Sequence, residues 1–148
     1  MHWTLDTTHS AAEFAVKHLM ISTVKGRFSK LAGTGETNSD GTLKAVDMTL
    51  DVASIDTNEP KRDEHLRSAD FFDVVRFPTL AFRSTKIETA GTDIAITGDL
   101  TIRGVTRPVT LKGEISGAIT DPWGNARSAL AVSAKISRKE WEIGRAHV

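Results

Sequence analysis

The chain has 148 residues, of which 39% are apolar and 26% charged, and its 19 Lys and Arg residues are balanced by 19 Asp and Glu residues. These values are typical of a soluble globular protein, and we interpret residues 1–148 as a single domain. The even charge balance argues against a nucleic-acid partner. The absence of cysteine excludes disulfides, thiolate metal sites and a cysteine nucleophile.

No apolar run approaches the roughly 18 residues of a membrane-spanning helix, so we predict no membrane span. The N-terminal residues MHWTLDTTHS lack the basic start and apolar core of a secretory signal. We therefore expect a cytoplasmic protein, or a periplasmic one if a leader has been removed.

Alternation of apolar and polar residues predicts short β-strands along most of the chain. The first strands are expected at residues 3–6 and 14–28. The clearest alternation lies at residues 46–52, where Val46, Met48 and Leu50 alternate with polar residues, which predicts one buried and one solvated face. Later strands are expected at residues 80–83, 94–102, 109–115 and 130–136. Gly98 interrupts the strand at residues 94–102 and predicts a bulge or bend there.

Residues 59–73 break this pattern with a short, highly charged helical insert. Pro60 suits the first turn of a helix, because its missing N–H would be unpaired there, and Asn58 is predicted to cap the helix with its side chain. A helix this polar is not stable alone. We therefore expect Leu66, Phe71 and Phe72 to pin it onto a sheet.

About seven or eight strands separated by turns predict an all-β sandwich or barrel. Closure into a barrel removes the exposed edges of a sheet. An extended antiparallel barrel of about eight strands is wide enough to hold a slender ligand.

The motifs of known enzymes are missing from the sequence. It has no G-x-S-x-G elbow, no H-E-x-x-H or EF-hand pattern and no phosphate loop, and its histidines lack metal-ligand spacing. We therefore predict no catalytic residue, no metal and no cofactor. The alternative is a hydrolase or isomerase that acts on a lipid-like substrate with His18 or His65.

His18 shares the predicted face of its strand with Phe14 and Val16. One interpretation is a polar handle inside the barrel that binds the head group of a ligand. The other is a histidine at the rim that bonds to backbone.

The charged residues of the insert also have two interpretations. Arg62, Asp63 and His65 could gate the mouth of the barrel. Alternatively they are structural, with Asp63 pairing with Arg67 across one helical turn while His65 holds the helix to a neighbouring strand.

The inward-facing apolar residues are mostly slender aliphatics, which suits either a solid core or an apolar channel. A solid core would make the protein a structural domain that presents a partner surface. A channel would accept the tail of a lipid. The candidate ligand-binding residues are Phe14, Val16, His18, Met48, Leu50, Arg62, Asp63, His65, Phe72, Phe82, Ile96, Leu100, Leu130 and Val132.

Three blocks of the sequence resemble the YceI-like family of polyisoprenoid-binding, lipocalin-like barrels. Residues 62–84 match R-D-x-H-L-x-S-x-D-F-F-D followed by F-P-x-L-x-F-x-S. Residues 3–28 match W-x-L-D-x-x-H-S and F-x-V-x-H-L-M-I-x-x-V-x-G-x-F, and residues 98–109 match G-x-L-T-I-x-G-V-T-x-P-V. The resemblance favours the barrel over the sandwich. It implies a binding protein that carries or sequesters a polyisoprenoid or fatty amphiphile, such as a quinone, and that pairs as a homodimer.

The tail resembles the family only in part. The family closes with R-x-x-F/W-G-I/L, and here Trp141 matches the aromatic position while Glu142 stands where glycine is expected. We interpret residues 145–148 as a truncation or as residues foreign to the domain.

Overall fold

The structure is a computed structural model that describes residues 2–6, 10–18, 22–116, 119–120, 122–124, 126–141 and 143. For residues 16–18, 22–24, 126, 138 and 139 the description covers the backbone alone. The strands are β1 (His2–Thr4), β2 (Ala12–His18), β3 (Ser22–Phe28), β4 (Leu31–Thr37), β5 (Leu43–Asp51), β6 (Ile55–Asp56), β7 (Thr79–Ala90), β8 (Asp93–Ile102), β9 (Val105–Ile115), β10 (Ile119–Thr120), β11 (Ala126–Arg127) and β12 (Leu130–Ser133). The helices are α1 (Pro60–Arg67) and two 3₁₀ turns, η1 (Val52–Ser54) and η2 (Arg138–Trp141).

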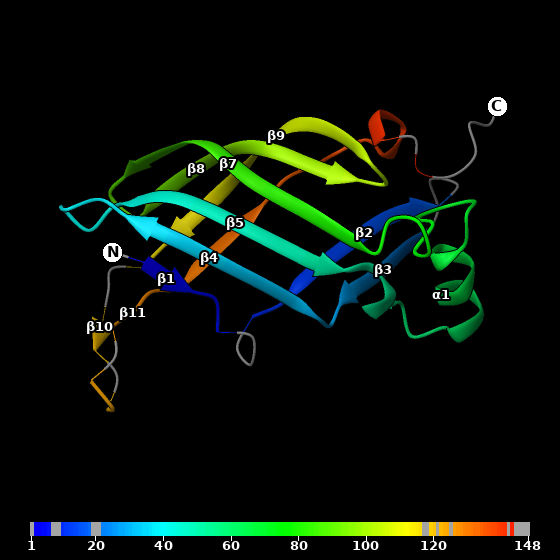
Figure 1. Cartoon of the computed structure of the whole chain (residues 1–148), viewed down its shortest axis with the longest axis horizontal. Helices are drawn as coiled ribbons and strands as arrows, with labels where there is room; N and C mark the ends of the chain where they lie inside the picture. Colours follow the sequence, from blue (N-terminus) through cyan, green and yellow to red (C-terminus); the bar gives the residue numbers. More distant parts are fainter. Residues whose placement is uncertain are drawn as a thin grey trace.

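Seven antiparallel strands form one curled main sheet in the order β1-β4-β5-β7-β8-β9-β12 (Figure 1). A second sheet, β2-β3-β6, lies at the same end of the molecule as α1, and the β10-β11 hairpin projects near the opposite end. Within the described residues β1 and β12 are the two edges of the main sheet and do not pair with each other. The predicted all-β, barrel-like fold is confirmed, as a half-barrel whose concave face is partly covered by the second sheet.

The register places apolar side chains opposite one another on the concave face. Leu31 pairs with Leu50 and Leu50 with Leu80, while Met48 pairs with Phe82 and Phe82 with Leu100. On the outer face, Arg83 lies between Asp47 and Asp99. The alternation predicted at residues 46–52 is therefore confirmed, because a period of two sends successive side chains to opposite faces.

The bulge predicted at Gly98 lies on the neighbouring strand. The register shifts between Ser84 and Lys86 of β7, so the irregularity lies on the strand opposite Gly98 and not on β8 itself. A Cβ at residue 98 would collide with the carbonyl oxygen of Arg83 and would lie 2.7 Å from Cζ of Phe82. Glycine is therefore needed because the backbone and the Phe82 ring approach it closely.

The core consists of two neighbouring clusters. The aromatic cluster has as its buried members Phe28, Val52, Ile55, Leu80, Ile102 and Trp141. The aliphatic cluster has as its buried members Val46, Phe82, Ile94 and Ile96. Leu100 and Val109 pack against both clusters, so the two meet at these side chains.

The helical insert begins with Glu59, not Asn58, as its cap. Oε1 of Glu59 accepts a hydrogen bond from the backbone N–H of Lys61 at 3.3 Å. Asn58 instead has a left-handed backbone with a φ of 63°, a conformation that asparagine tolerates better than most residues. The cap prediction was wrong because Asn58 supplies the left-handed backbone of the turn before the helix, and the next residue, Glu59, supplies the capping oxygen.

Leu66 and Phe72 both pack against the aromatic cluster, which confirms that the insert is pinned to the sheet. Phe71, the third expected contact, instead has its ring against the ring of His65 within the insert. The rings of Phe28 and Phe72 meet edge to face, with centroids 6.1 Å apart. Such geometry is the favoured one for aromatic pairs.

We expect Phe72→Ala to lower the free energy of unfolding by about 2 kcal/mol. A fully buried phenylalanine would cost about 3–5 kcal/mol on truncation, and Phe72 is only half-buried. Chemical denaturation measures the change. Val75→Ala is the control, because its side chain is 91% exposed and should change stability by less than about 0.5 kcal/mol. Equal effects of the two variants would show that the insert is not pinned.

The turn between β4 and β5 predicts a local pH dependence. The hydroxyl of Thr42, at 2.6 Å, and its backbone N–H, at 2.9 Å, donate to Oδ1 of Asp40 and hold the pKa of that carboxyl below its ordinary value of 3.8. A depressed pKa stabilises the turn above the ordinary value, and this stabilisation is lost as the pH falls through the depressed pKa. We expect the protection factor of the Thr42 amide, which is the ratio of its intrinsic to its observed exchange rate, to fall only at such acid pH. In Asp40→Asn, which keeps the acceptor oxygen, this protection factor should stay constant over the same pH range, and a protection factor that still falls would contradict this assignment.

Candidate functional site

The concave face of the main sheet carries apolar side chains that the described residues cover only in part. Its half-buried members include Met48, Leu50, Leu100, Val109, Leu111 and Val132. Protein interiors are normally packed to crystal-like density, so apolar side chains that face inward and are only partly covered mark a surface that can take further apolar groups. This face is the candidate site.

About half of the fourteen candidates chosen from the sequence are found on this face. The aliphatic cluster and its packed neighbours bring together Met48, Phe82, Ile96, Leu100 and Val132. Phe14, Leu50 and Phe72 pack against the aromatic cluster instead. Leu130 lies on β12 opposite Ile115 and is 38% exposed. The side chains of Val16 and His18 lie outside the described residues, so their proposed contacts stay predictions.

Arg62 and Asp63 form a compact network around Thr57. Oδ1 of Asp63 accepts hydrogen bonds from the backbone N–H of Thr57 at 2.9 Å and from its hydroxyl at 2.5 Å. Nε of Arg62 donates to Oγ1 of Thr57, and Nη2 donates to its carbonyl oxygen, both at 2.9 Å. Thr57 and Asp63 are both buried. The network therefore ties the start of α1 to the end of β6.

The predicted pair between Asp63 and Arg67 is replaced by other partners. Arg67 donates from Nε to the carbonyl of Ala53 at 3.0 Å and from Nη2 to that of Ile55 at 3.2 Å. The carboxylate of Asp63 is turned toward Thr57, and the longer Arg67 side chain reaches the backbone carbonyls of Ala53 and Ile55. Thr57 was missed by sequence reasoning, because its partners depend on how the loop before α1 folds back.

His65 lies on the surface of the insert. Its side chain is 60% exposed, its ring meets the ring of Phe71 edge to face at 4.8 Å, and Nε2 lies 3.9 Å from Oδ2 of Asp70. These partners all belong to the insert, so the expected link from His65 to a neighbouring strand is replaced by a contact within the helix and its loop.

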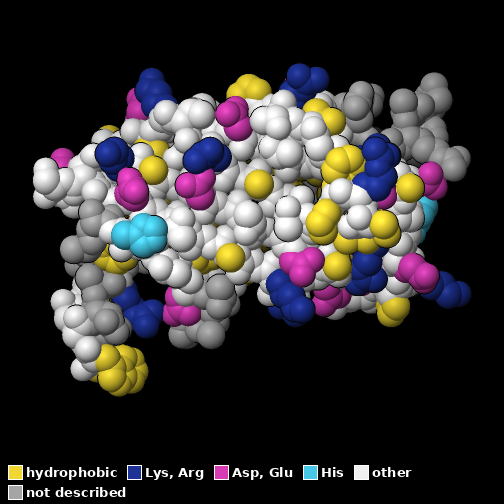
Figure 2. All heavy atoms as spheres, in the orientation of Figure 1, with side chains coloured by type: hydrophobic (Ala, Val, Ile, Leu, Met, Phe, Trp, Pro, Cys, Tyr) yellow, Lys and Arg dark blue, Asp and Glu magenta, His cyan; other side chains and the backbone are white. Residues whose placement is uncertain are grey.

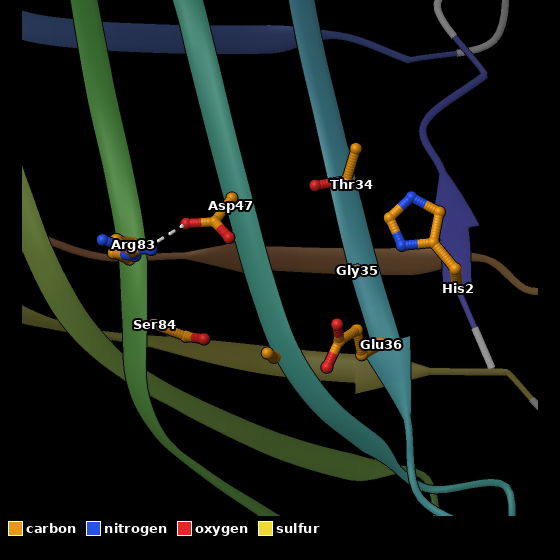
Figure 3. A pocket seen from close by; sticks show the side chains of 8 residues that line it. His2, Thr34, Gly35, Glu36, Asp47, Arg83 and Ser84 are labelled. Carbon is orange, nitrogen blue, oxygen red and sulfur yellow. Dashed lines mark ion pairs between the residues drawn. The ribbon is translucent and has the colours of Figure 1, made fainter.

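A polar pocket of about 260 Å³ lies on the outside of the sheet (Figure 3). It is lined by His2, Thr34, Gly35, Glu36, Ala45, Asp47, Arg83 and Ser84. Nε of Arg83 and Oδ1 of Asp47 form an ion pair across it at 3.3 Å. The pocket contains none of the candidate ligand-binding residues, and its charged lining does not suit an apolar tail.

In the parts of the chain that the structure describes, no group of three or more His, Cys, Asp or Glu side chains is placed to hold a metal ion. No helix among these residues is both long and apolar enough to cross a bilayer.

The outer face of the main sheet carries a mixture of positively and negatively charged side chains. Figure 2 shows Lys, Arg, Asp and Glu side chains intermixed over the outside of β4, β5 and β7. Hydrophobic side chains gather toward the end of the molecule that carries α1. The outer face of β4, β5 and β7 is thus an ordinary solvated surface, and on the face in view the apolar side chains gather at the end that carries α1.

Residues 3–148 match the family model described as the YceI-like domain. Protein YceI of Escherichia coli is 39% identical over 136 residues, which are 91% of this chain and 71% of that protein. A YceI protein of Campylobacter jejuni, solved as a crystal structure, superimposes with a TM-score of 0.78 at 32% identity, over 95% of this chain and 84% of the other.

A polyisoprenoid-binding domain from Saccharophagus degradans, implicated in plant cell wall breakdown, shares the fold with a TM-score of 0.53 at 15% identity. The match covers 75% of this chain and 66% of that domain. The matched family model and the identity to YceI of Escherichia coli agree with the three sequence blocks and with the curled antiparallel sheet. The chain belongs to the YceI-like domain family.

Proposed function

We propose that the protein binds an amphiphile with a long isoprenoid or fatty tail on the concave face of the main sheet, and that it carries or sequesters this molecule without chemical change. The observation that carries the proposal is the set of half-buried apolar side chains on that face. The polyisoprenoid-binding domain from Saccharophagus degradans, which has the same fold, supports the class of ligand.

The energetics favour a tail over a polar ligand. Burial of about ten CH₂ groups gives a gross gain of about 8 kcal/mol. That gain corresponds to about micromolar affinity before the costs of ordering the tail and of association are subtracted. The tail can therefore supply the affinity, and only a few polar groups are needed to choose a head group.

The contacts of the insert assign it a supporting role. Arg62 and Asp63 are hydrogen-bonded to Thr57, and Leu66 and Phe72 pack on the aromatic cluster. The insert thus holds one end of the half-barrel together. We propose that head-group recognition is separate from this network, with His18 as the polar handle. A quinone head group and pairing as a homodimer stay predictions.

The experiment is a search for bound lipid, followed by titration. The purified protein is extracted with organic solvent, the extract is analysed by mass spectrometry, and the stripped protein is titrated with an all-trans prenyl alcohol. A prenyl or fatty lipid in the extract, and saturable binding that leaves the ligand intact, would support carriage. Turnover of lipid esters that disappears in His65→Ala would overturn the proposal in favour of a hydrolase, and a lipid-free protein that binds no prenyl alcohol would also overturn it.

A further inference from the structure

The β1 edge of the main sheet carries apolar side chains on the concave face. Trp3 pairs with Gly35, and Gly35 pairs with the buried Val46, so the Trp3 side chain lies on the same side of the sheet as that of Val46. Its indole Nε1 donates to Oγ1 of Thr37 at 3.3 Å, which fixes the ring on this edge. Leu5, two residues further along, lies on the same side. Trp3 and Leu5 are both half-buried, so each keeps apolar surface that a ligand can contact.

The β12 edge also carries apolar side chains on this face. Leu130 pairs with Ile115 and Val132 with Gly113, and Ile115 and Val132 both pack against the aliphatic cluster. Leu130 is 38% exposed, whereas Ile96, on β8 and on the same face, is 1% exposed. The apolar surface of the concave face is thus covered at β8 and exposed at the β12 edge.

An ion pair joins the chain just beyond these two edges. Nη1 of Arg127 donates to Oδ2 of Asp6 at 2.7 Å, and the two side chains are 47% and 33% exposed. Asp6 follows β1 by two residues, and Arg127 precedes β12 by three. Figure 1 shows β1 and the β10-β11 hairpin at the same end of the molecule. This edge ion pair therefore links the two sides of the half-barrel, whose edge strands do not pair with each other in the described part of the chain.

The two sides of the link are not equally well anchored. On the β12 side, Ser116 exchanges two hydrogen bonds of 2.8 Å with the backbone of Ala129, and its carbonyl oxygen accepts one of 3.0 Å from the hydroxyl of Ser128. On the other side, β1 has three residues and pairs, as far as the structure describes it, with β4 alone. Rupture of the edge ion pair would therefore release the β1 edge, while the start of β12 stays in place.

We propose that the lipid tail enters the concave face from the side, between β1 and β12, and that the ion pair between Asp6 and Arg127 controls this entrance. This inference rests on the proposed function. At the end that carries α1, the insert packs Leu66 and Phe72 onto the aromatic cluster, so a tail that entered there would have to displace them. A side entrance instead lets a long tail move in along its whole length. Trp3, which was not among the candidates from the sequence, is then an apolar contact at the entrance.

The first test compares rates of ligand exchange. The stripped protein is mixed with a fluorescent fatty acid in a stopped-flow instrument. Arg127→Asp places two carboxylates at the edge ion pair, and both the association and the dissociation rate should rise about fivefold, which is what loss of a partly exposed ion pair allows. Because both rates rise together, the Kd should stay within about twofold of wild type. Adding Asp6→Arg to Arg127→Asp reverses the pair and should restore the wild-type rates.

Arg83→Asp is the matched control for Arg127→Asp. It breaks the ion pair between Arg83 and Asp47, which joins β5 to β7 on the outer face and does not connect the two edges. The substitution makes the same change of charge at an exposed arginine. Its exchange rates should equal those of wild type.

A second test locates the entrance and leaves the edge ion pair intact. The sequence has no cysteine, so a single introduced cysteine can be labelled with a bulky maleimide. Ala131→Cys places the label on the exposed outer side of β12, opposite Glu114, and thus beside the entrance but off the concave face. Val75→Cys places it in the loop after α1, at a side chain that is 91% exposed. The label at residue 131 should slow association, and the label at residue 75 should not.

The outcomes separate the two proposals. Wild-type protein that binds no prenyl alcohol or fatty acid would overturn the proposed function. Ligand binding with wild-type exchange rates in Arg127→Asp, or equal acceleration in Arg127→Asp and Arg83→Asp, would overturn the side entrance while leaving lipid binding intact. Association that is slowed by the label at residue 75 and not by the label at residue 131 would also overturn it, and would place the entrance at the end that carries α1.

Discussion

Asp63→Ala is expected to lower the free energy of unfolding by about 3 kcal/mol. The carboxylate is 7% exposed, and it is the acceptor for both the backbone N–H and the hydroxyl of Thr57, which is itself buried. Its removal leaves these donors without their acceptor, and each buried unsatisfied donor costs about 1–3 kcal/mol. Urea denaturation, followed by circular dichroism, measures the loss.

Two variants of the same helix serve as controls. Asp63→Asn keeps one acceptor oxygen and should lose roughly half as much stability. Glu64→Ala removes the neighbouring carboxylate, which is exposed, and should change stability by less than about 0.5 kcal/mol. If Asp63→Ala were no more destabilising than Glu64→Ala, the network around Thr57 would not hold the insert.

Gly98→Val is expected to cost about 3 kcal/mol. The new Cβ would collide with the backbone oxygen of Arg83 and lie 2.7 Å from Cζ of Phe82. A ring can rotate away but a strand carbonyl cannot, so β7 and β8 must separate locally, and overpacking of this kind costs about 1–3 kcal/mol or more. Thermal unfolding followed by calorimetry measures the loss.

Thr97→Val is the matched control for Gly98→Val. It places the same side chain at the neighbouring position, where the residue it replaces has nearly the same shape. Its only described loss is the hydroxyl contact with Thr110 at 3.1 Å, for which we expect about 0.5 kcal/mol. A Gly98→Val protein as stable as Thr97→Val would mean that the strands do not approach as closely as described.

The strands were predictable because their signal is local. A period of two along residues 46–52 reports which side of the sheet each side chain occupies, and the structure follows it with Val46 buried and Asp47 exposed. Pro60 marked the start of α1 for a similar reason, since its ring fixes the backbone for the first turn. In both cases the residue and its neighbours in the sequence are sufficient to predict the local structure.

The failures involve partners that are distant in sequence. The bulge belongs to β7 rather than to Gly98, because a shift of register is a property of two paired strands. The partner of Asp63 is Thr57, because the loop before α1 folds back toward the helix. The spacing of apolar residues in the sequence does not reveal the path of such a loop. Trp141 matched a family position, but its contact with Leu100 spans 41 residues and needed the structure.

The candidate site was predictable as a face but not as a set of contacts. Alternation correctly placed Met48, Phe82 and Leu100 on one side of the sheet. It could not tell which inward-facing residues are packed and which are half-buried, because that depends on how the sheet curls and on where η2 and the insert cover it.

The central claim is that an apolar tail lies along the concave face. The most direct measurement is the affinity for one prenyl alcohol in two variants of β9, Val109→Trp and Thr110→Trp. Val109 is half-buried and packs against both core clusters, whereas Thr110 is exposed on the outer face. A tryptophan at 109 would occupy the surface that the tail needs, and the same side chain at 110 would not.

Both variants are first checked for cooperative unfolding. The account predicts that Val109→Trp weakens binding at least about tenfold, which corresponds to about 1.4 kcal/mol, while Thr110→Trp stays within about twofold of wild type. Equal affinity in the two folded variants would contradict it and would place the ligand elsewhere.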